Sequence, residues 1–195
     1  MTDEYLTISS IGEGYYTEKR SKFLAWAHHV ETADQVKTLI DDYRRRYYDA
    51  RHVCYAYVLG HQRTIFRAVD DGEPSSTAGK PILGQIHSAD LTDILVVVVR
   101  YYGGVNLGTG GLITAYREAA SQAIANADKQ VRQVEELIDY NYPYTMMNAV
   151  MRVVKDMQPR IVSQSFDTTC QLRLSIRKGL ADQLRQRLEG LAFST

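Results

Sequence analysis

Three carboxylates stand close together in the stretch DDGEP, at Asp70, Asp71 and Glu73. Carboxylates at this spacing can bind a divalent cation or act as general acid and base. A cation requires more oxygen ligands than this single turn offers, so the sequence favours a solvated turn in which one carboxylate caps the next element. A salt bridge from the turn to Arg67 or Arg100 is the other structural alternative.

A second candidate is the glycine-rich stretch GGVNLGTGG, which follows an apolar run and precedes a predicted helix. Such a strand–loop–helix junction can present backbone N–H groups and a helix N-terminus to an anion. The stretch departs from both phosphate-binding fingerprints, because Ile113 interrupts the dinucleotide pattern and Thr109 stands where the Walker lysine is required. A sharp chain reversal with close strand–helix packing therefore explains the glycines as well as weak anion binding does.

His52 and Cys54 lie two residues apart in a predicted strand, so their side chains share one face. A Cys–His nucleophile pair needs a third group that orients the base, and structural zinc needs about four ligands. Packing or a hydrogen bond is therefore favoured for both residues, and neither a metal nor a cofactor is expected. The cysteines, Cys54 and Cys170, are expected to be reduced and buried.

The charge and hydropathy of the sequence indicate neither a membrane-spanning segment nor a general affinity for nucleic acids. The 195 residues contain 23 Lys and Arg and 23 Asp and Glu, so the formal net charge is zero and no overall field attracts polyanions. No apolar run approaches the roughly 20 residues that span a bilayer, and the N-terminal stretch does not resemble a signal peptide. We therefore expect a cytoplasmic protein without membrane contact.

Basic and aromatic residues nevertheless recur together, in EKRSKF at 18–23, YRRRYY at 43–48 and VRYY at 99–102. Arginine beside tyrosine suits RNA phosphates and exposed bases. Solvated helix ends and hairpin rims are a commoner explanation of the same pattern. RNA contact is therefore the minority interpretation on composition alone, and no DNA specificity is expected.

Hydrophobic periodicity predicts the elements that must position these residues. Thr32 and Gln35 form a capping box that begins a helix, and the run 93–102 is apolar on both faces, as is typical of a central strand. Serine or threonine before Pro81 is expected to cap a short helix. The other elements predicted in this half are strands at 22–30, 52–60 and 64–69 and helices at 81–88 and 111–127.

From about residue 132 the predicted order is strand, helix, strand, strand, helix, which suggests a ferredoxin-like unit. Its final strand would come from LAFST at 191–195, which is very short. We therefore predict an α+β protein with two domains, at 1–131 and 132–195. The elements predicted in the second domain lie at 134–141, 144–157, 160–166, 169–177 and 180–190.

Four long motifs together resemble the YigZ/IMPACT family: RSKFLAWAHHV, ARHVCYAYVLG, DDGEPSSTAGKPIL and VVVVRYYGGVNLGTGGLITAY. They stand in the family's order and spacing over about Lys19 to Ala127. The resemblance implies that the first domain is similar to the second domain of ribosomal protein S5 and to domain IV of elongation factor G. It implies that the second domain is ferredoxin-like, similar to domain V of that factor.

The resemblance also implies a function class. Eukaryotic members restrain the amino-acid-starvation branch of translation control, but they carry a partner-binding RWD domain that this chain is too short to hold, and bacterial members have no settled activity. We expect a non-enzymatic regulator of translation that binds RNA, the ribosome or a translation factor, of unknown oligomeric state. The alternative is an enzyme or small phosphate binder that uses the acidic turn, His52 and the glycine-rich junction.

Position by position, the family motifs mark residues that are expected to form one binding surface beside the end of the valine-rich strand. Asn106 stands where many members have lysine, and the loss of that cation weakens the interpretation of the junction as an anion cradle. Ser76 stands where glycine is common. The predicted binding residues are His52, Asp70, Asp71, Glu73, Thr77, Lys80, Arg100, Tyr101, Gly103, Gly104, Asn106, Gly108, Gly110, Gly111 and Arg117.

Overall fold

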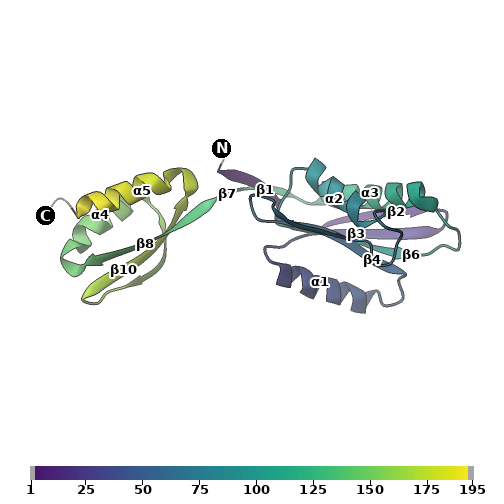
Figure 1. The fold of residues 1–195 in the computed structure, drawn as a ribbon, viewed down its shortest axis with the longest axis horizontal. Helices are drawn as coiled ribbons and strands as arrows, with labels where there is room; N and C mark the ends of the chain where they lie inside the picture. Colours follow the sequence, from purple (N-terminus) through teal and green to yellow (C-terminus); the bar gives the residue numbers. More distant parts are fainter. Residues whose placement is uncertain (1–2, 193–195) are drawn as a thin grey trace. The chain divides into compact units, whose positions relative to one another are not determined.

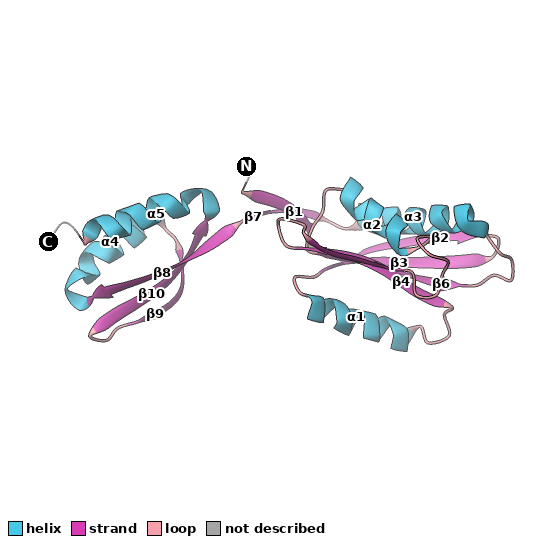
Figure 2. Ribbon diagram, viewed as in Figure 1, coloured by secondary structure: helices cyan, strands magenta, loops and turns pink. Residues whose placement is uncertain are grey.

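The computed structural model describes residues 3–192, which form two compact units by their internal contacts. The larger unit is Tyr5–Arg132, and the smaller one contains the residues up to Glu4 and the chain from Gln133 onward. Both units mix helix and strand (Figure 1, Figure 2), which confirms the predicted α+β class. The boundary predicted between residues 131 and 132, as the limit of two independent domains, stays a prediction.

A five-stranded antiparallel sheet with the strand order β2-β3-β6-β4-β5 forms the larger unit. β6 (Ile94–Tyr101) lies at its centre, as its continuous apolar sequence predicted, and its residues up to Val99 are completely buried. The other strands of this sheet are β2 (Gly12–Glu18), β3 (Ser21–His29), β4 (His52–Leu59) and β5 (Ile65–Val69).

Helices cover both faces of the five-stranded sheet (Figure 1). α1 (Ala33–Arg46) packs on one face, whereas α2 (Gly79–Ser88) and α3 (Gly108–Asn126) pack on the other (Figure 2). Each face has its own core because side chains alternate along a strand. In β6, for example, Val98 belongs to the core under α2 and α3, and Val97 belongs to the core under α1.

The start of α1 is as predicted, and the starts of the other two helices are not. Thr32 and Gln35 form the predicted capping box of α1. α2 begins at Gly79, two residues before its predicted start, and has no serine or threonine cap. The cap predicted from a carboxylate of the acidic turn is confirmed: Asp70 Oδ1 lies 2.8 Å from the Gly79 nitrogen. α3 begins at Gly108 and not at residue 111, so the second half of the glycine-rich stretch is helical.

Three strands were not predicted from the sequence: β1 (Glu4–Ile8), β2 and β7 (Lys129–Gln133). β1 and β7 pair in a separate two-stranded sheet. β2 contains Gly12 and Gly14, which suggest a loop, but both glycines face α3, where a Cβ atom would overlap carbonyl oxygens of the helix. The glycines therefore allow α3 to pack directly on the edge strand.

The smaller unit contains a three-stranded antiparallel sheet with the order β8-β10-β9 and two helices. The order strand, helix, strand, strand, helix is the predicted ferredoxin-like one. Of the short last strand expected at 191–195, Leu191 ends α5 and residues 193–195 lie outside the described residues. The elements are β8 (Glu135–Pro143), a 3-10 turn (Tyr144–Met146), α4 (Met147–Met157), β9 (Arg160–Ser165), β10 (Thr169–Arg177) and α5 (Lys178–Leu191).

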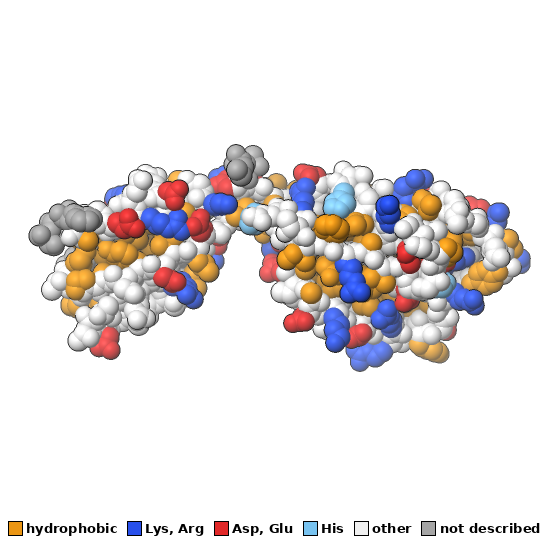
Figure 3. Space-filling model, in the orientation of Figure 1, with side chains coloured by type: hydrophobic (Ala, Val, Ile, Leu, Met, Phe, Trp, Pro, Cys, Tyr) orange, Lys and Arg blue, Asp and Glu red, His pale blue; other side chains and the backbone are white. Residues whose placement is uncertain are grey.

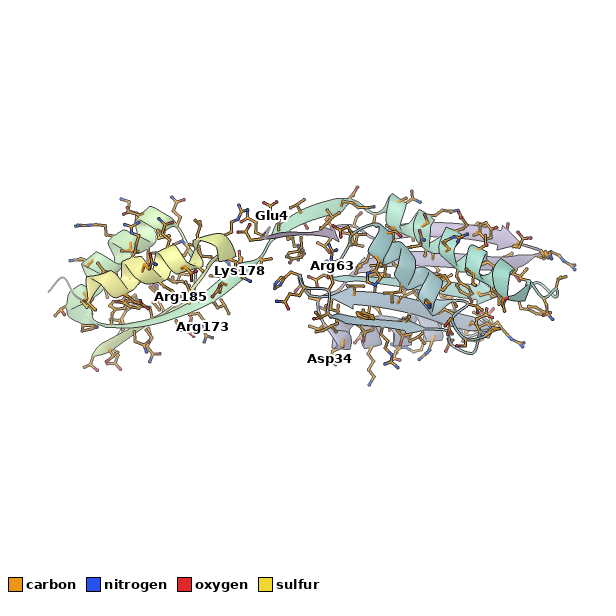
Figure 4. The ribbon with its side chains drawn as sticks, turned by 45° about the horizontal axis from the view of Figure 1, so that its top comes forward. Glu4, Asp34, Arg63, Arg173, Lys178 and Arg185 are labelled. Carbon is orange, nitrogen blue, oxygen red and sulfur yellow. The ribbon has the colours of Figure 1, made fainter. Side chains whose placement is uncertain are left out.

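Several ion pairs lie on the surface of the smaller unit. Arg173 of β10 binds both oxygens of Asp139 on β8, at 2.6 and 2.9 Å, and Arg185 of α5 binds Glu136. Figure 4 labels the two arginines. Such exposed pairs contribute little to stability. Within residues 3–192, no helix is long and apolar enough to cross a membrane.

We expect Gly14→Ala to destabilise the larger unit by about 2 kcal/mol, because the new methyl group overlaps the α3 backbone and forces a shift of the helix. Trp26 of β3 is the single tryptophan of the chain, so its fluorescence during urea denaturation reports on this unit. Gly84→Ala on α2 is the matched control: no atom lies within 4 Å of its Cβ position, and the change is expected to stabilise by up to about 1 kcal/mol. Equal transition midpoints for Gly14→Ala and the wild type would contradict the close packing.

Candidate functional site

A buried ion pair anchors the acidic turn. Glu73 Oε1 lies 2.6 Å from Arg100 Nη1 of β6 and 2.7 Å from the hydroxyl oxygen of Tyr116 on α3. All three residues are buried, and Glu73 is only 8% exposed. The predicted solvated turn is therefore wrong for Glu73, and the alternative salt bridge to Arg100 forms through this residue and not through an aspartate.

The two aspartates of the turn bind backbone groups of the protein. Asp70 caps α2, and its Oδ2 also accepts the N–H of Ser76 at 2.9 Å. Asp71 Oδ2 accepts the N–H of Val53 on β4 at 2.7 Å, while its Oδ1 pairs with Arg44 of α1 at 3.2 Å. Both carboxylates thus hold the turn against neighbouring elements, and neither lines the pocket described below.

His52 is oriented by the same turn. Its Nδ1 lies 2.7 Å from the carbonyl oxygen of Asp71, so Nδ1 carries the proton, and its Nε2 lies 3.7 Å from Glu73 Oε2. Cys54 shares the strand face of His52, but its thiol is completely buried, and burial raises its pKa. The thiol is therefore no nucleophile at neutral pH. Among residues 3–192, no group of three or more His, Cys, Asp or Glu could hold a metal ion.

A pocket of about 490 Å³ lies between the acidic turn, the end of β6 and the start of α3. Its volume is in the range of ligand-binding pockets. Its lining combines polar groups with the apolar side chains of Pro74, Leu107 and Leu112. The predicted binding residues that line it are His52, Glu73, Arg100, Asn106 and Gly108.

The cations of the pocket are only partly neutralised. The lining contains Arg51 and Arg100 but the single carboxylate of Glu73, which already binds Arg100. Arg51 is exposed and has no carboxylate partner in the described part of the chain. Both guanidinium groups lie 5.7 Å from the ring centre of Tyr102, and the buried Nε–H of Arg100 has no hydrogen-bond partner within residues 3–192. Arg51 therefore leaves the pocket with a free donor group and an unbalanced positive charge.

The N-terminus of α3 adds backbone donors to the same pocket. Gly108 and Thr109 line it, and no side chain caps this helix at Leu107. The first N–H groups of a helix have no acceptor within the helix, and the dipole favours an anion there. Asn106 carries no charge, but its Oδ1 accepts the hydroxyl of Tyr102 at 3.2 Å, so it positions the aromatic ring.

Four predicted binding residues with long side chains or hydroxyl groups lie outside the pocket lining. Thr77 is buried and donates to the carbonyl oxygen of Pro74 at 2.6 Å. The Tyr101 hydroxyl donates to Asp49 at 2.9 Å, and Tyr101 packs on the α1 side of the sheet. The side chains of Lys80 and Arg117 are exposed on α2 and α3. Their predicted part in binding is therefore not supported by the pocket.

The remaining glycines of the junction lie outside the lining too. Gly103 donates its N–H to Ser21 Oγ at 3.1 Å, and a Cβ atom there would overlap the backbone of Arg20, so this glycine permits a close approach. Gly104 has a φ of 88°, in the left-handed region that favours glycine. Gly110 and Gly111 lie in the first turn of α3, where ligand contact stays a prediction.

Seven residues of the pocket lining are absent from the predicted binding residues: Arg51, Gly72, Pro74, Tyr102, Leu107, Thr109 and Leu112. The pairing of His52 with Arg100 in the β4–β6 ladder places the residues that precede β4 beside those that follow β6. Arg51 directly precedes His52, and Tyr102 follows Arg100 by two residues. The recurrence of arginine beside tyrosine was the signal that could have found them.

Taken together, the fold and the pocket define an α+β protein with a donor-rich, partly aromatic ligand pocket in its larger unit. The model of the Impact N-terminal domain matches residues 19–124. An IMPACT family member from Haemophilus influenzae is 34% identical over 160 residues, which cover 81% of this chain and 78% of that protein. IMPACT family member YigZ from Escherichia coli is 32% identical over 162 residues, with coverages of 81% and 78%. The chain belongs to the IMPACT family, as its motifs predicted.

A solved structure extends this likeness to both units. The crystal structure of a hypothetical protein superposes with a TM-score of 0.79 at 28% identity and covers 100% of this chain and 94% of its own. The likeness agrees with the α+β class and assigns no activity, so the function must be argued from the pocket.

Arg100→Met leaves the carboxylate of Glu73 buried without its cation, and we expect it to lower the free energy of unfolding of the larger unit by about 3–5 kcal/mol. Glu73→Gln combined with Arg100→Met removes both charges and is expected to recover part of that loss. Arg44→Met breaks the half-exposed pair with Asp71 and is expected to cost less than about 1 kcal/mol. Urea denaturation followed by Trp26 fluorescence measures all three. Similar losses for Arg100→Met and Arg44→Met would show that the buried pair has no special role.

Proposed function

We propose that this protein binds single-stranded RNA through the pocket of its larger unit and acts in translation without catalysing a reaction. The observation that carries the proposal is Arg51, an exposed guanidinium with no carboxylate partner in the described residues, beside the ring of Tyr102. Guanidinium groups bind phosphate, and arginine and tyrosine side chains stack on unpaired bases. The uncapped N-terminus of α3 supplies further phosphate donors to the same pocket.

The loop between α1 and β4 extends this basic and aromatic character beyond the pocket. Tyr48 in this loop is 85% exposed, and Arg46 lies 6.0 Å from the ring centre of Tyr43 without a carboxylate partner in the described part of the chain. Figure 3 shows Lys and Arg side chains gathered over α1, with acidic side chains between them. Arg44 pairs with Asp71 and Arg45 pairs with Asp42, so Arg46 and Arg51 are the arginines of this region that have no carboxylate partner in the described residues.

The assignment to translation is supported by the family. This chain belongs to the IMPACT family, and the resemblance implies that eukaryotic members act in translation control. A shared fold does not define a function, so the choice of RNA over a protein ligand rests on the chemistry of Arg51, Tyr102 and the α3 N-terminus.

Catalysis is the second candidate because His52 directs Nε2 toward Glu73 in the pocket lining. A hydrogen bond at Nδ1 that fixes the imidazole and leaves Nε2 available is typical of a histidine general base. The buried Cys54 thiol is unsuited to attack a substrate because burial raises its pKa. Binding is favoured since the other polar groups of the pocket are donors that suit an anion.

Titration of a labelled single-stranded RNA across a salt series tests the proposal. We expect binding that weakens steeply as salt rises, because phosphate contacts release counterions. Arg51→Gln should weaken binding about tenfold at low salt and reduce the salt slope by about one. Arg152→Gln is the matched control, because Arg152 of α4 is exposed and has no ion-pair partner within residues 3–192.

Two results would contradict the RNA proposal. The first is the absence of binding by the wild type at low salt. The second is a protein that does not bind free RNA but co-sediments with ribosomes, with or without the Arg51→Gln substitution. This result would indicate a protein ligand.

A further inference from the structure

We infer that β5, an edge strand of the five-stranded sheet, binds an extended segment of another protein, which adds to the sheet as a further strand. The segment that fits is apolar and carries an acidic residue opposite Arg67. Within the described part of the chain, β5 contributes no residue to the pocket lining, so the inference is independent of the proposed function.

The outer edge of β5 is open. β5 stands last in the strand order β2-β3-β6-β4-β5, and β4 is its partner among the described strands. Residues 65–68 are exposed on both faces of the strand, with exposed fractions of 57% for Ile65 and 55% for Phe66. An edge strand presents unpaired backbone N–H and C=O groups along its outer side, and these groups can pair with an added chain.

The opposite edge strand of the sheet, β2, is closed by side chains of α3. Gln122 Oε1 accepts the N–H of Tyr15 at 3.1 Å, and Asn126 Nδ2 donates to the carbonyl oxygen of Glu13 at 2.7 Å. Among residues 3–192, no side chain binds the backbone of β5 in this way. β5 also contains no proline, and its ladder with β4 has no bulge. The sheet thus protects one edge and leaves the other accessible.

Packing against α2 holds β5 in its strand conformation. A Cβ atom at Gly79 would lie 2.4 Å from the Val69 nitrogen, so α2 packs directly against the backbone at the end of β5. The rings of Phe66 and His87 on α2 meet edge to face, with 6.0 Å between their centres. A strand that is already ordered lowers the entropy cost of adding a partner.

The side chains of β5 define the chemistry of the partner. Ile65 and Arg67 project from one face and Phe66 from the other, because successive side chains alternate. Arg67 is exposed and has no partner in the described part of the chain. Paired strands gain stability when apolar side chains face each other and when opposite charges face each other. The matching segment therefore has apolar residues opposite Ile65 and Phe66 and a carboxylate opposite Arg67.

Arg67 also disfavours a second copy of this chain as the occupant. It is the central residue of the five in β5. Symmetric antiparallel pairing of two β5 strands in full register would place two guanidinium groups opposite each other, and like charges in that position destabilise a pair of strands. One charge at the centre of an open edge therefore hinders self-association and selects an acidic partner.

NMR titration of the whole chain with the synthetic peptide TTEVVETT tests the inference. Its central EVVE offers two valines and a glutamate to β5 in either strand direction. We expect saturable shifts of the backbone amide signals of Ile65, Phe66 and Arg67, and an affinity about fivefold higher than for TTKVVKTT. Arg67→Glu should reverse this preference, whereas Arg152→Glu on α4 should leave it unchanged. Circular dichroism verifies that each variant is folded.

The peptide TTEPPETT tests pairing through the backbone. Proline has no N–H, and one of two neighbouring residues in a strand must direct its N–H toward β5, so this peptide should give no saturable shifts. The inference would be overturned if TTEVVETT caused no shifts in β5, or if either control peptide bound equally well. Signals of β5 that shift with protein concentration without peptide would also overturn it, because they would indicate a second copy as the occupant.

Discussion

The buried ion pair between Glu73 and Arg100 is the contact on which the geometry of the site depends. It fastens the acidic turn to the central strand, and the Tyr116 hydroxyl ties α3 to the same carboxylate. The neighbouring aspartates extend this anchorage to the start of α2 and to β4. An unpaired charge in the low-polarity interior is costly, so Glu73 and Arg100 are stable there only as a pair. The acidic turn must therefore pack against the central strand. One short turn therefore sets the positions of two helices and two strands.

This anchorage decides which groups remain free for a ligand. The three carboxylates of the turn are engaged with protein donors, so the conspicuous acidic cluster is structural. The accessible groups left without partners at its border include the first amides of α3 and the guanidinium of Arg51. The guanidinium of Arg51 and the first amides of α3 suit an anion, and the adjacent Tyr102 ring suits a flat group attached to it.

Local signals predicted those elements that depend on local interactions. The capping box of α1 involves residues three positions apart, and the buried β6 needs only its own apolar run. β2 was missed because its glycines favour a loop when the strand is considered alone. Its strand conformation depends on pairing with β3 and on α3, which packs against Gly12 and Gly14.

The sequence by itself determined the α+β class, the order of most elements, the family and the two motifs that contribute to the pocket. Only the tertiary structure decided that Glu73, and not an aspartate, meets Arg100, and which of the three predicted carboxylates caps α2. It also decided that Arg51 and Tyr102 lie at one pocket while Lys80 and Arg117 lie outside it. The physical reason is that periodicity and composition record what a residue does along its own segment. The partner of a buried charge is set by strand register and packing between segments far apart in the chain.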